Sequence, residues 1–155
     1  MADLALFEGQ SADINKYLIF KVNNEFYGID VAMVNNIIQL PTITKVPSSP
    51  KYFKGIINLR GEIVPVMSLR RKMNYSDDTF TKESRIIILN IGEDKLIGVI
   101  VDAVKEVLTI SEDEIEQPSP FLKKEESVVK GVGKMDDNLI SILDVSSIVS
   151  KELAS

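Results

Sequence analysis

The 155-residue sequence contains no cysteine and no histidine. Without cysteine, the chain cannot form a disulfide and offers no thiolate to a metal or a substrate. Without histidine, it also lacks the commonest general base and the commonest metal ligand. This composition argues against a zinc, copper or haem site. We therefore expect no cofactor and no enzymatic activity, and the composition favours a binding protein.

Long apolar runs and a basic surplus are missing as well. No uninterrupted apolar stretch approaches the roughly 18 residues that a membrane helix needs. The net charge is −5; residues 1–78 hold nine basic and eight acidic side chains, and residues 79–155 hold nine and fifteen. Proteins that bind duplex nucleic acid usually carry a basic surplus or stripe. We expect neither membrane insertion nor nucleic-acid binding, and we interpret the basic run Arg70-Arg71-Lys72 as the solvated end of an element.

The N-terminus does not have the features of a secretory signal. The stretch MADLALFEGQSADINK carries Asp3, Glu8 and Asp13 before its first lysine. That charge order is wrong for a signal peptide, and no apolar region followed by a cleavage site is present. We interpret residues 1–15 as a flexible tail and predict a cytoplasmic protein.

The sequence repeats itself in two blocks. GIDVAMVNNII (28–38) resembles GVIVDAVKEVL (98–108) at an offset of 70, and GIINLRGEIVPVMSL (55–69) resembles GVGKMDDNLISILDV (131–145) at an offset of 76. Each pair begins with glycine, and a lysine precedes both members of the second pair. Two alignments in the same order indicate a duplicated unit.

Short β-rich runs separated by turn residues make up each unit. YLIFKV and EFYGID flank Asn23-Asn24, and SRIIILNI and KLIGVIV flank the sequence GED; both patterns are typical of β-hairpins. A further hairpin is predicted at 55–69 with Arg60-Gly61 at its tip, and its repeat has Asp136-Asp137-Asn138 at the tip. Several short strands with frequent turns suggest small barrels.

Helical signals are few. Asp30 is predicted to cap a short helix over VAMVNNII (31–38), whose apolar residues fit one face. Ser111 and Glu114 have the spacing of a capping box, and Asp144 is predicted to cap a terminal helix. The chain is therefore expected to be mainly β with a few short helices.

Two features admit both a structural and a functional interpretation. Arg60-Gly61 either fills a two-residue turn, with Gly61 at positive φ and the arginine solvated, or it presents a planar guanidinium to a carboxylate or amide of a partner. The repeat accepts acidic residues at the same tip, so arginine is not needed to form the hairpin. Val34 and Val104, which match across the repeat, are either core residues or part of an interaction patch.

Four stretches carry a resemblance to a known family. They are YLIFKVNNEFYGIDVAMVNNI, VPSSPKYFKGIINLRGEIVPVMSL, IGVIVDAVKEVL and VVKGVGKMDDNLISILDV, which together span about residues 16 to 149. The pattern FxKGxxNLRGxIxPVxxL is far more specific than a lone glycine motif. On these stretches the chain resembles the CheW family of bacterial chemotaxis coupling proteins.

This resemblance implies two five-stranded SH3-like β-barrels on a shared hydrophobic core. They would form one CheW-like domain over 16–150, with an approximate divide between the lobes near 74–84 and strands that can cross between them. The resemblance also implies a non-catalytic adaptor in signal transduction. CheW-like proteins link the cytoplasmic tips of transmembrane chemoreceptors to the regulatory domain of the histidine kinase CheA. They are recruited to receptor arrays at the inner face of the membrane.

The resemblance assigns roles to individual residues. The positions that match receptor-binding residues of the family are Asn58, Arg60, Val104 and Val107. The positions that match kinase-binding residues are Val34, Asn36, Lys54 and Gly55. Asn36 departs from the family, which often has glutamate there, so that a charge-assisted contact becomes a neutral one.

Other functions fit the sequence less well. An SH3-like nucleic-acid-binding module conflicts with the net charge of −5. An enzyme conflicts with the missing histidine and cysteine and with the lack of a convergent acidic pair. A CheW-like adaptor that serves a kinase outside motility stays open as an alternative.

Overall fold

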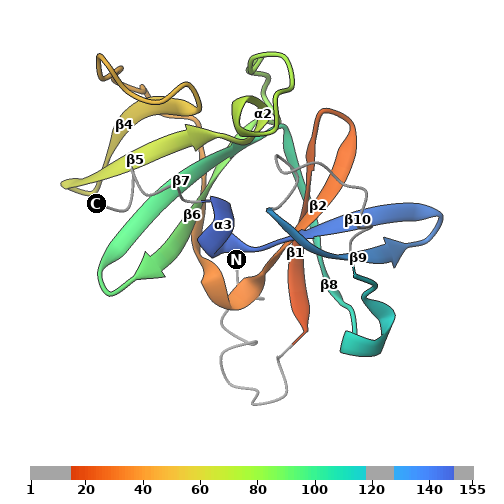
Figure 1. The fold of residues 1–155 in the computed structure, drawn as a ribbon. Helices are drawn as coiled ribbons and strands as arrows, with labels where there is room; N and C mark the ends of the chain where they lie inside the picture. The colour runs from red at the N-terminus through yellow and green to blue at the C-terminus, as the bar shows by residue number, and fades with distance from the viewer. Residues whose placement is uncertain (1–14, 118–127, 149–155) are drawn as a thin grey trace.

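The computed structural model describes residues 15–117 and 128–148 and is mainly β (Figure 1). The strands are β1 (Lys16–Val22), β2 (Glu25–Asp30), β3 (Val34–Gln39), β4 (Phe53–Leu59), β5 (Glu62–Ser68), β6 (Arg85–Gly92), β7 (Lys95–Val101), β8 (Ala103–Thr109), β9 (Val129–Met135) and β10 (Asn138–Leu143). The short helical segments are η1 (Val31–Met33), α2 (Leu69–Lys72), η2 (Glu112–Glu114) and α3 (Val145–Ile148).

The strands of the described residues form two five-stranded sheets. The first has the order β8-β1-β2-β10-β9 and the second the order β3-β6-β7-β5-β4. In the second sheet, a bridge between Thr44 and Ile56 joins the segment after β3 to the edge strand β4. In the first, a bridge between Glu116 and Val132 joins the segment after β8 to the edge strand β9. Each sheet therefore curls towards closure, and the predicted fold class is confirmed; we call the sheets the first and second barrel.

The two barrels exchange strands. The first barrel combines β1 and β2 with β8, β9 and β10, whereas the second takes β3, β4 and β5 with β6 and β7. The chain crosses to the second barrel through η1 and returns at Asp102, between β7 and β8. Residues 74–84 separate the two repeats along the chain, but each barrel draws strands from both sides of that segment.

The sheet orders confirm the duplication. When each strand of the second sheet is replaced by its repeat equivalent, β3 by β8 and β4 by β9, the order of the first sheet results. The register agrees: Gly28 of β2 pairs with Ile142 of β10, and Gly98 of β7 pairs with Val66 of β5. These pairs differ by the offsets of 70 and 76 that the sequence shows.

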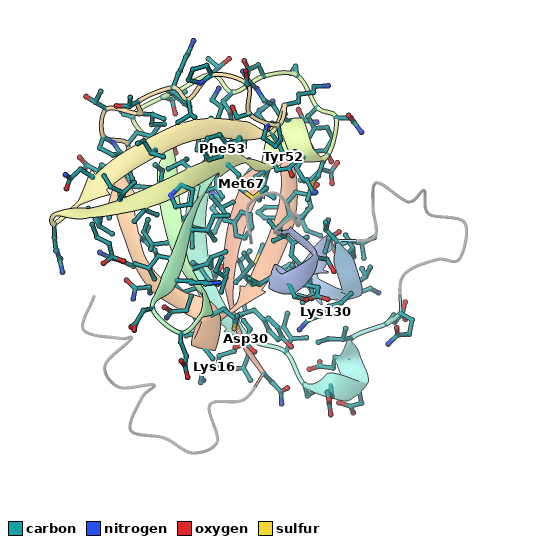
Figure 2. All side chains as sticks on the ribbon, turned by 60° about the vertical axis from the view of Figure 1, so that its left-hand side comes forward. Lys16, Asp30, Tyr52, Phe53, Met67 and Lys130 are labelled. Carbon is teal, nitrogen blue, oxygen red and sulfur yellow. The ribbon has the colours of Figure 1, made fainter. Side chains whose placement is uncertain are left out.

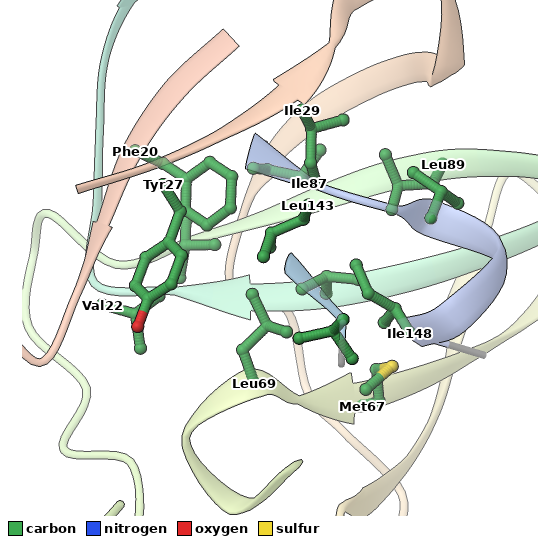
Figure 3. Close-up of a cluster of buried hydrophobic side chains, with 14 of the residues drawn as sticks. Phe20, Val22, Tyr27, Ile29, Met67, Leu69, Ile87, Leu89, Leu143 and Ile148 are labelled. Atoms are coloured by element: carbon green, nitrogen blue, oxygen red, sulfur yellow. The ribbon is translucent and has the colours of Figure 1, made fainter. Parts of the chain in front are cut away.

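Three apolar clusters hold this arrangement together. One fills each barrel, and the third, which we call the shared core, lies between them (Figure 3). Its fully buried members include Phe20 and Ile29 from the first barrel and Met67 and Ile87 from the second. Val145 and Ile148 of α3 also pack into it. Two barrels that are small on their own thus share one large apolar contact.

Strands β1 and β6 are apolar on both faces because each lies between a barrel interior and the shared core. In β1, Tyr17 and Ile19 face the first barrel, whereas Leu18 and Phe20 face the shared core. Successive side chains of a strand point to opposite faces. Double burial therefore explains why YLIF and IIIL read as continuous apolar runs.

The turn predictions held better than the helix predictions. Asn23 and Asn24 have φ of 54° and 64°, as a type I′ turn requires. Asp30 caps only the three-residue η1, accepting a hydrogen bond from the Ala32 amide at 2.9 Å. The predicted helix over 31–38 is wrong beyond Met33, because the following residues form β3 and pair with β6.

The two remaining cap predictions fall on short elements. Glu114 accepts a hydrogen bond from the Ser111 amide at 3.0 Å, which confirms the capping-box contact, but only the three-residue η2 follows. Asp144 accepts one from the Ser146 amide at 3.1 Å at the start of α3. The rest of the predicted terminal helix, and all of the predicted tail except Asn15, lie outside the described residues.

Candidate functional site

The β4–β5 hairpin tip carries an arginine in an unusual conformation. Arg60 and Gly61 both have positive φ, 54° and 85°, and Asn58 Oδ1 accepts a hydrogen bond from the Gly61 amide at 2.8 Å. Asn58 thus shapes the turn, and Arg60 is exposed. A non-glycine residue with positive φ costs about 1–2 kcal/mol unless it is Asn or Asp. The equivalent tip of the first barrel has Asp136 there, with φ of 56°, so arginine is a costly choice for the turn itself.

The edge strands β3 and β8 present equivalent apolar residues. Val34 and Ile37 of β3, and Val104 and Val107 of β8, are half-buried and pack against the shared core. Each strand also has a bulge at the matching place: Asn35 in the pairing of β3 with β6, and Lys105 in the pairing of β8 with β1. These four side chains are therefore partly core and partly surface residues.

The polar residues of the two edge strands differ. Asn36 accepts a hydrogen bond through its side chain from the Ile37 amide at 2.8 Å. Its repeat equivalent in β8 is Glu106, which is exposed. The sequence Val104-Lys105-Glu106-Val107 thus has the glutamate that the equivalent sequence Val34-Asn35-Asn36-Ile37 lacks. The two strands share a backbone conformation, but only β8 carries charged side chains, Lys105 and Glu106.

Lys54 lies at a bulge in β4 and is bound within the molecule. It follows Phe53, which pairs with Met67 of β5 (Figure 2). Its Nζ lies 3.1 Å from Asp77 Oδ1 and 3.6 Å from Asp78 Oδ2, and its side chain is 16% exposed. Lys130, also labelled in Figure 2, occupies the matching bulge of β9. Lys54 therefore fastens the segment after α2 to the edge of the second barrel.

Gly55 is required by the closure of the second barrel. It has φ of 143°, and a Cβ added there would lie 2.2 Å from the carbonyl oxygen of Thr44. That carbonyl accepts a hydrogen bond from the Ile56 amide at 2.8 Å, so the backbone at Thr44 is held against β4 and cannot move away from an added Cβ. The family resemblance implied a binding role for Gly55, and the structure adds a backbone role.

The structure groups the predicted site residues by barrel. Val34, Asn36, Lys54 and Gly55 all belong to the second barrel, on its two edge strands. The receptor set is divided: Asn58 and Arg60 belong to the second barrel, and Val104 and Val107 to the first. Figure 1 shows the β4–β5 tip at the left of the view and β8 at the lower right.

Sequence reasoning missed the role of the basic run at α2. Arg70 donates hydrogen bonds to both oxygens of Asp102, at 3.2 and 2.7 Å, where the chain crosses between the barrels. Arg71 likewise binds Asp77 at 2.9 and 2.7 Å. The interpretation of this run as a solvated element end is wrong, because two of its three residues form bidentate ion pairs.

These ion pairs keep both carboxyl groups charged. Burial raises the pKa of Asp102, but the hydrogen bonds from Arg70 and the Asn23 amide lower it by more, and the resulting pKa lies below its ordinary value. The hydrogen bonds from Arg71 hold the pKa of Asp77 well below its usual range. Neither carboxyl is therefore poised to exchange a proton near neutral pH.

The described residues contain neither a metal-binding cluster nor a membrane-spanning helix. Within 15–117 and 128–148 no cluster of acidic side chains is arranged to hold a metal ion. Over the same ranges no helix is long and apolar enough to cross a membrane. The features that stand out are surfaces: two edge strands and two hairpin tips.

Known proteins match this chain over nearly its whole length. A family model described as the CheW-like domain matches residues 16–153. The chain is 36% identical over 138 residues to the chemotaxis protein CheW of Bacillus subtilis, with 88% of each chain covered. It is 33% identical to the chemotaxis protein CheW of Thermotoga maritima, covering 86% of this chain and 87% of that one.

A solved structure agrees with the sequence matches. The scaffolding protein TtCheW from Thermoanaerobacter tengcongensis has a TM-score of 0.81 and 36% identity, with 90% of each chain covered. The same stretches that form the edge strands and the β4–β5 tip lie within the matched region. This chain belongs to the CheW-like family, and it is a non-catalytic chemotaxis scaffolding protein.

Proposed function

We propose that this protein couples transmembrane chemoreceptors to the histidine kinase CheA. One surface binds the cytoplasmic tip of the receptor, and another binds the regulatory domain of the kinase. The observation that carries the proposal is the pair of edge strands β3 and β8, which flank the shared core with equivalent valines but differ in charge. Two related but non-identical surfaces on one molecule suit a bridge between two different partners.

The receptor surface centres on β8. Val104 and Val107 leave apolar area at the edge of the first barrel, and an amphipathic helix binds such a surface through apolar anchors three or four residues apart. Arg60 contributes a separate receptor contact from the tip of the second barrel, held in place by Asn58. Arginine is frequent in interface hot spots, which fits its unfavourable conformation in this turn.

The kinase surface lies on the second barrel. Val34 and Asn36 provide its contacts from β3. Lys54 and Gly55 act on this surface by shaping β4, since Lys54 binds Asp77 and Gly55 packs on Thr44. A contact at Asn36 would be neutral, whereas a glutamate there would add a charge.

Coupling of the receptor state to kinase activity requires contacts that differ in strength between the receptor states. A receptor state that binds this protein and its kinase more tightly shifts the kinase equilibrium by the difference in binding free energy. Each contact can be weak, because an array at the inner face of the membrane raises the effective concentration of every partner. No catalytic step by this chain is needed.

Replacing Arg60 with asparagine tests the role of Arg60 in receptor binding separately from its role in folding. Asparagine tolerates positive φ, so the free energy of unfolding should stay the same or rise by up to about 1 kcal/mol. Affinity for a receptor tip fragment should fall at least about tenfold, as expected for loss of one good charged contact. Denaturant unfolding and a titration with the fragment measure the two effects.

Asp136→Asn is the matched control for this substitution. It changes the equivalent residue of the other tip, at φ of 56°, and should leave receptor affinity unchanged. Equal receptor affinity for Arg60→Asn and the parent protein would show that Arg60 has no receptor role.

Substitutions in β3 should affect the kinase instead. Val34→Asp places a charge on the proposed kinase surface and should weaken binding to the CheA regulatory domain about tenfold or more. Because Val34 also packs on the shared core, Asn36→Arg serves as a second variant with a smaller effect on folding. Both should retain receptor binding, and unchanged kinase affinity in both would contradict the assignment of β3.

An adaptor for a kinase outside motility would use the same surfaces. Reconstitution with receptor fragments and CheA distinguishes the two functions. We expect kinase activity to respond to the receptor only when this protein is present. A protein that binds the fragments but leaves CheA activity unaltered would favour the alternative.

A further inference from the structure

A polar hollow lies beside the first residues of β8. It has a volume of about 300 Å³, and its charged lining residues are Lys21, Arg70, Glu83, Asp102 and Lys105. Figure 1 shows the elements that surround it, α2 and the β1–β2 hairpin, near the top of the view. Arg70 and Asp102 neutralise each other, and Glu83 offsets one of the two lysines, so the lining keeps a net charge of +1.

The cationic groups of the hollow keep hydrogen-bonding capacity that the protein does not use. Within the described part of the chain, neither Lys21 nor Lys105 forms an ion pair. The Lys21 ammonium lies over the Phe26 ring, 5.8 Å from its centroid, a contact that uses none of its hydrogen-bond donors on a carboxylate. Arg70 uses Nε and Nη2 for Asp102, while its Nη1 makes only long contacts, of 3.4 Å to Ser76 and 3.5 Å to Asn23. Strong hydrogen bonds to an anion are shorter than these contacts. Nη1 is therefore available to a better acceptor.

A buried hydroxyl adds a further donor. Ser84 lines the hollow and is 4% exposed. Its Oγ accepts a hydrogen bond from the Thr81 amide at 2.9 Å. A hydroxyl has one proton to donate, and among residues 15–117 and 128–148 no acceptor receives it from Ser84. Cations and a free hydroxyl donor are the groups that a carboxylate needs.

The fold does not require these charges. In the repeat, Ala32 is equivalent to Asp102 and Asn35 is equivalent to Lys105, at the offset of 70. The pairing of β1 with β2 matches that of β6 with β7, and in this match Asn90 is equivalent to Lys21. Ser146 is equivalent to Arg70 at the offset of 76. The equivalent place beside β3 thus forms with uncharged residues at all four positions, and the charged hollow is particular to the β8 side.

The hollow adjoins the surface already proposed for the receptor. Lys105 is the bulge residue of β8 and follows Val104 directly. Val104 packs towards the shared core, while Lys105 is exposed and lines the hollow. One partner segment lying along β8 would therefore meet an apolar surface and a cationic hollow side by side.

We propose that this hollow binds a carboxylate side chain of the receptor segment that covers Val104 and Val107. The inference rests on the proposed receptor role of β8 and adds a specificity element to it: the bound segment presents an aspartate or glutamate beside its apolar anchors. Lys21 and Lys105 attract the carboxylate, and Arg70 Nη1 and the Ser84 hydroxyl orient it.

The test compares charge reversals in the full-length protein. Lys105→Glu and Lys21→Glu should each weaken binding of a receptor tip fragment about tenfold, a typical effect of placing like charge against a partner's charge. Lys105→Met should weaken it less and should make the affinity less sensitive to salt, because one screened attraction is lost. Lys95→Glu makes the same charge change at the exposed first residue of β7 in the second barrel and should bind as the parent does.

The outcomes distinguish this inference from the function on which it rests. If Val107→Ala weakens receptor binding while Lys105→Glu and Lys21→Glu do not, the hollow has no receptor role and the β8 surface stands. If none of the three variants changes binding, the proposed function of β8 is wrong as well. If Lys95→Glu weakens binding as much as Lys105→Glu, only overall charge matters and the specific site is refuted.

Discussion

Gly55→Ala should unfold much of the population or cost about 4 kcal/mol of stability, among the largest effects of a single substitution. The added Cβ would meet the Thr44 carbonyl oxygen at 2.2 Å, and the φ of 143° is strained for any L-residue. The position of the Cβ is fixed by the Gly55 backbone, and the Thr44 oxygen belongs to backbone in the closure of the second barrel, so no flexible side chain can move aside. Denaturant unfolding followed by circular dichroism measures the loss.

Gly61→Ala is the matched control, because Gly61 also has positive φ, 85°, but a Cβ there would have no atom within 4 Å. It should cost only about 1–2 kcal/mol, the conformational penalty alone. If Gly55→Ala costs no more than Gly61→Ala, the closure does not depend on Gly55. If it costs far more, loss of kinase binding by a Gly55 variant reflects folding rather than a missing contact.

Phe20→Ala should destabilise both barrels at once, by about 3–5 kcal/mol. Phe20 is fully buried in the shared core and stacks on Tyr27, with ring centroids 6.0 Å apart (Figure 3). Because the barrels exchange strands and share this core, we expect them to unfold as one unit. Amides of β10 in the first barrel and β6 in the second should lose hydrogen-exchange protection by a similar factor, on the order of a hundred to a thousand.

Phe26→Ala provides the comparison for this prediction. Phe26 is in the same hairpin but is half-buried and packs on the first barrel's own cluster, so its loss should cost less. If Phe20→Ala reduces hydrogen-exchange protection only in the first barrel, the two barrels unfold independently.

Local features of the fold were predictable because neighbouring residues decide them. Asn23-Asn24 forms its turn through the tolerance of asparagine for positive φ, and Ser111 and Glu114 meet because they are three residues apart. The duplication was visible since glycines and apolar residues recur at fixed offsets. The candidate surface residues came from the family resemblance, Asn58 and Arg60 from the motif NLRG and the others from the neighbouring matched stretches, rather than from periodicity.

Other features depend on contacts between distant residues. The segment after Met33 becomes a strand because β6, some fifty residues later, pairs with it and thereby overrides a helix-like pattern. Arg70 finds Asp102 only because the chain returns to the first barrel beside α2. Nothing in a run of three basic residues indicates such a partner.

The sequence by itself determined the turns, the repeat, the family and the absence of histidine and cysteine chemistry, since each depends on residue identity or short spacing. The tertiary structure alone decided which strands share a barrel, that Lys54 binds Asp77 while Gly55 serves the closure of the second barrel, and that Arg60 and β8 lie on different barrels. The reason is the exchange of strands at η1 and Asp102. There, pairing and burial between segments far apart in the chain outweigh their order in the sequence.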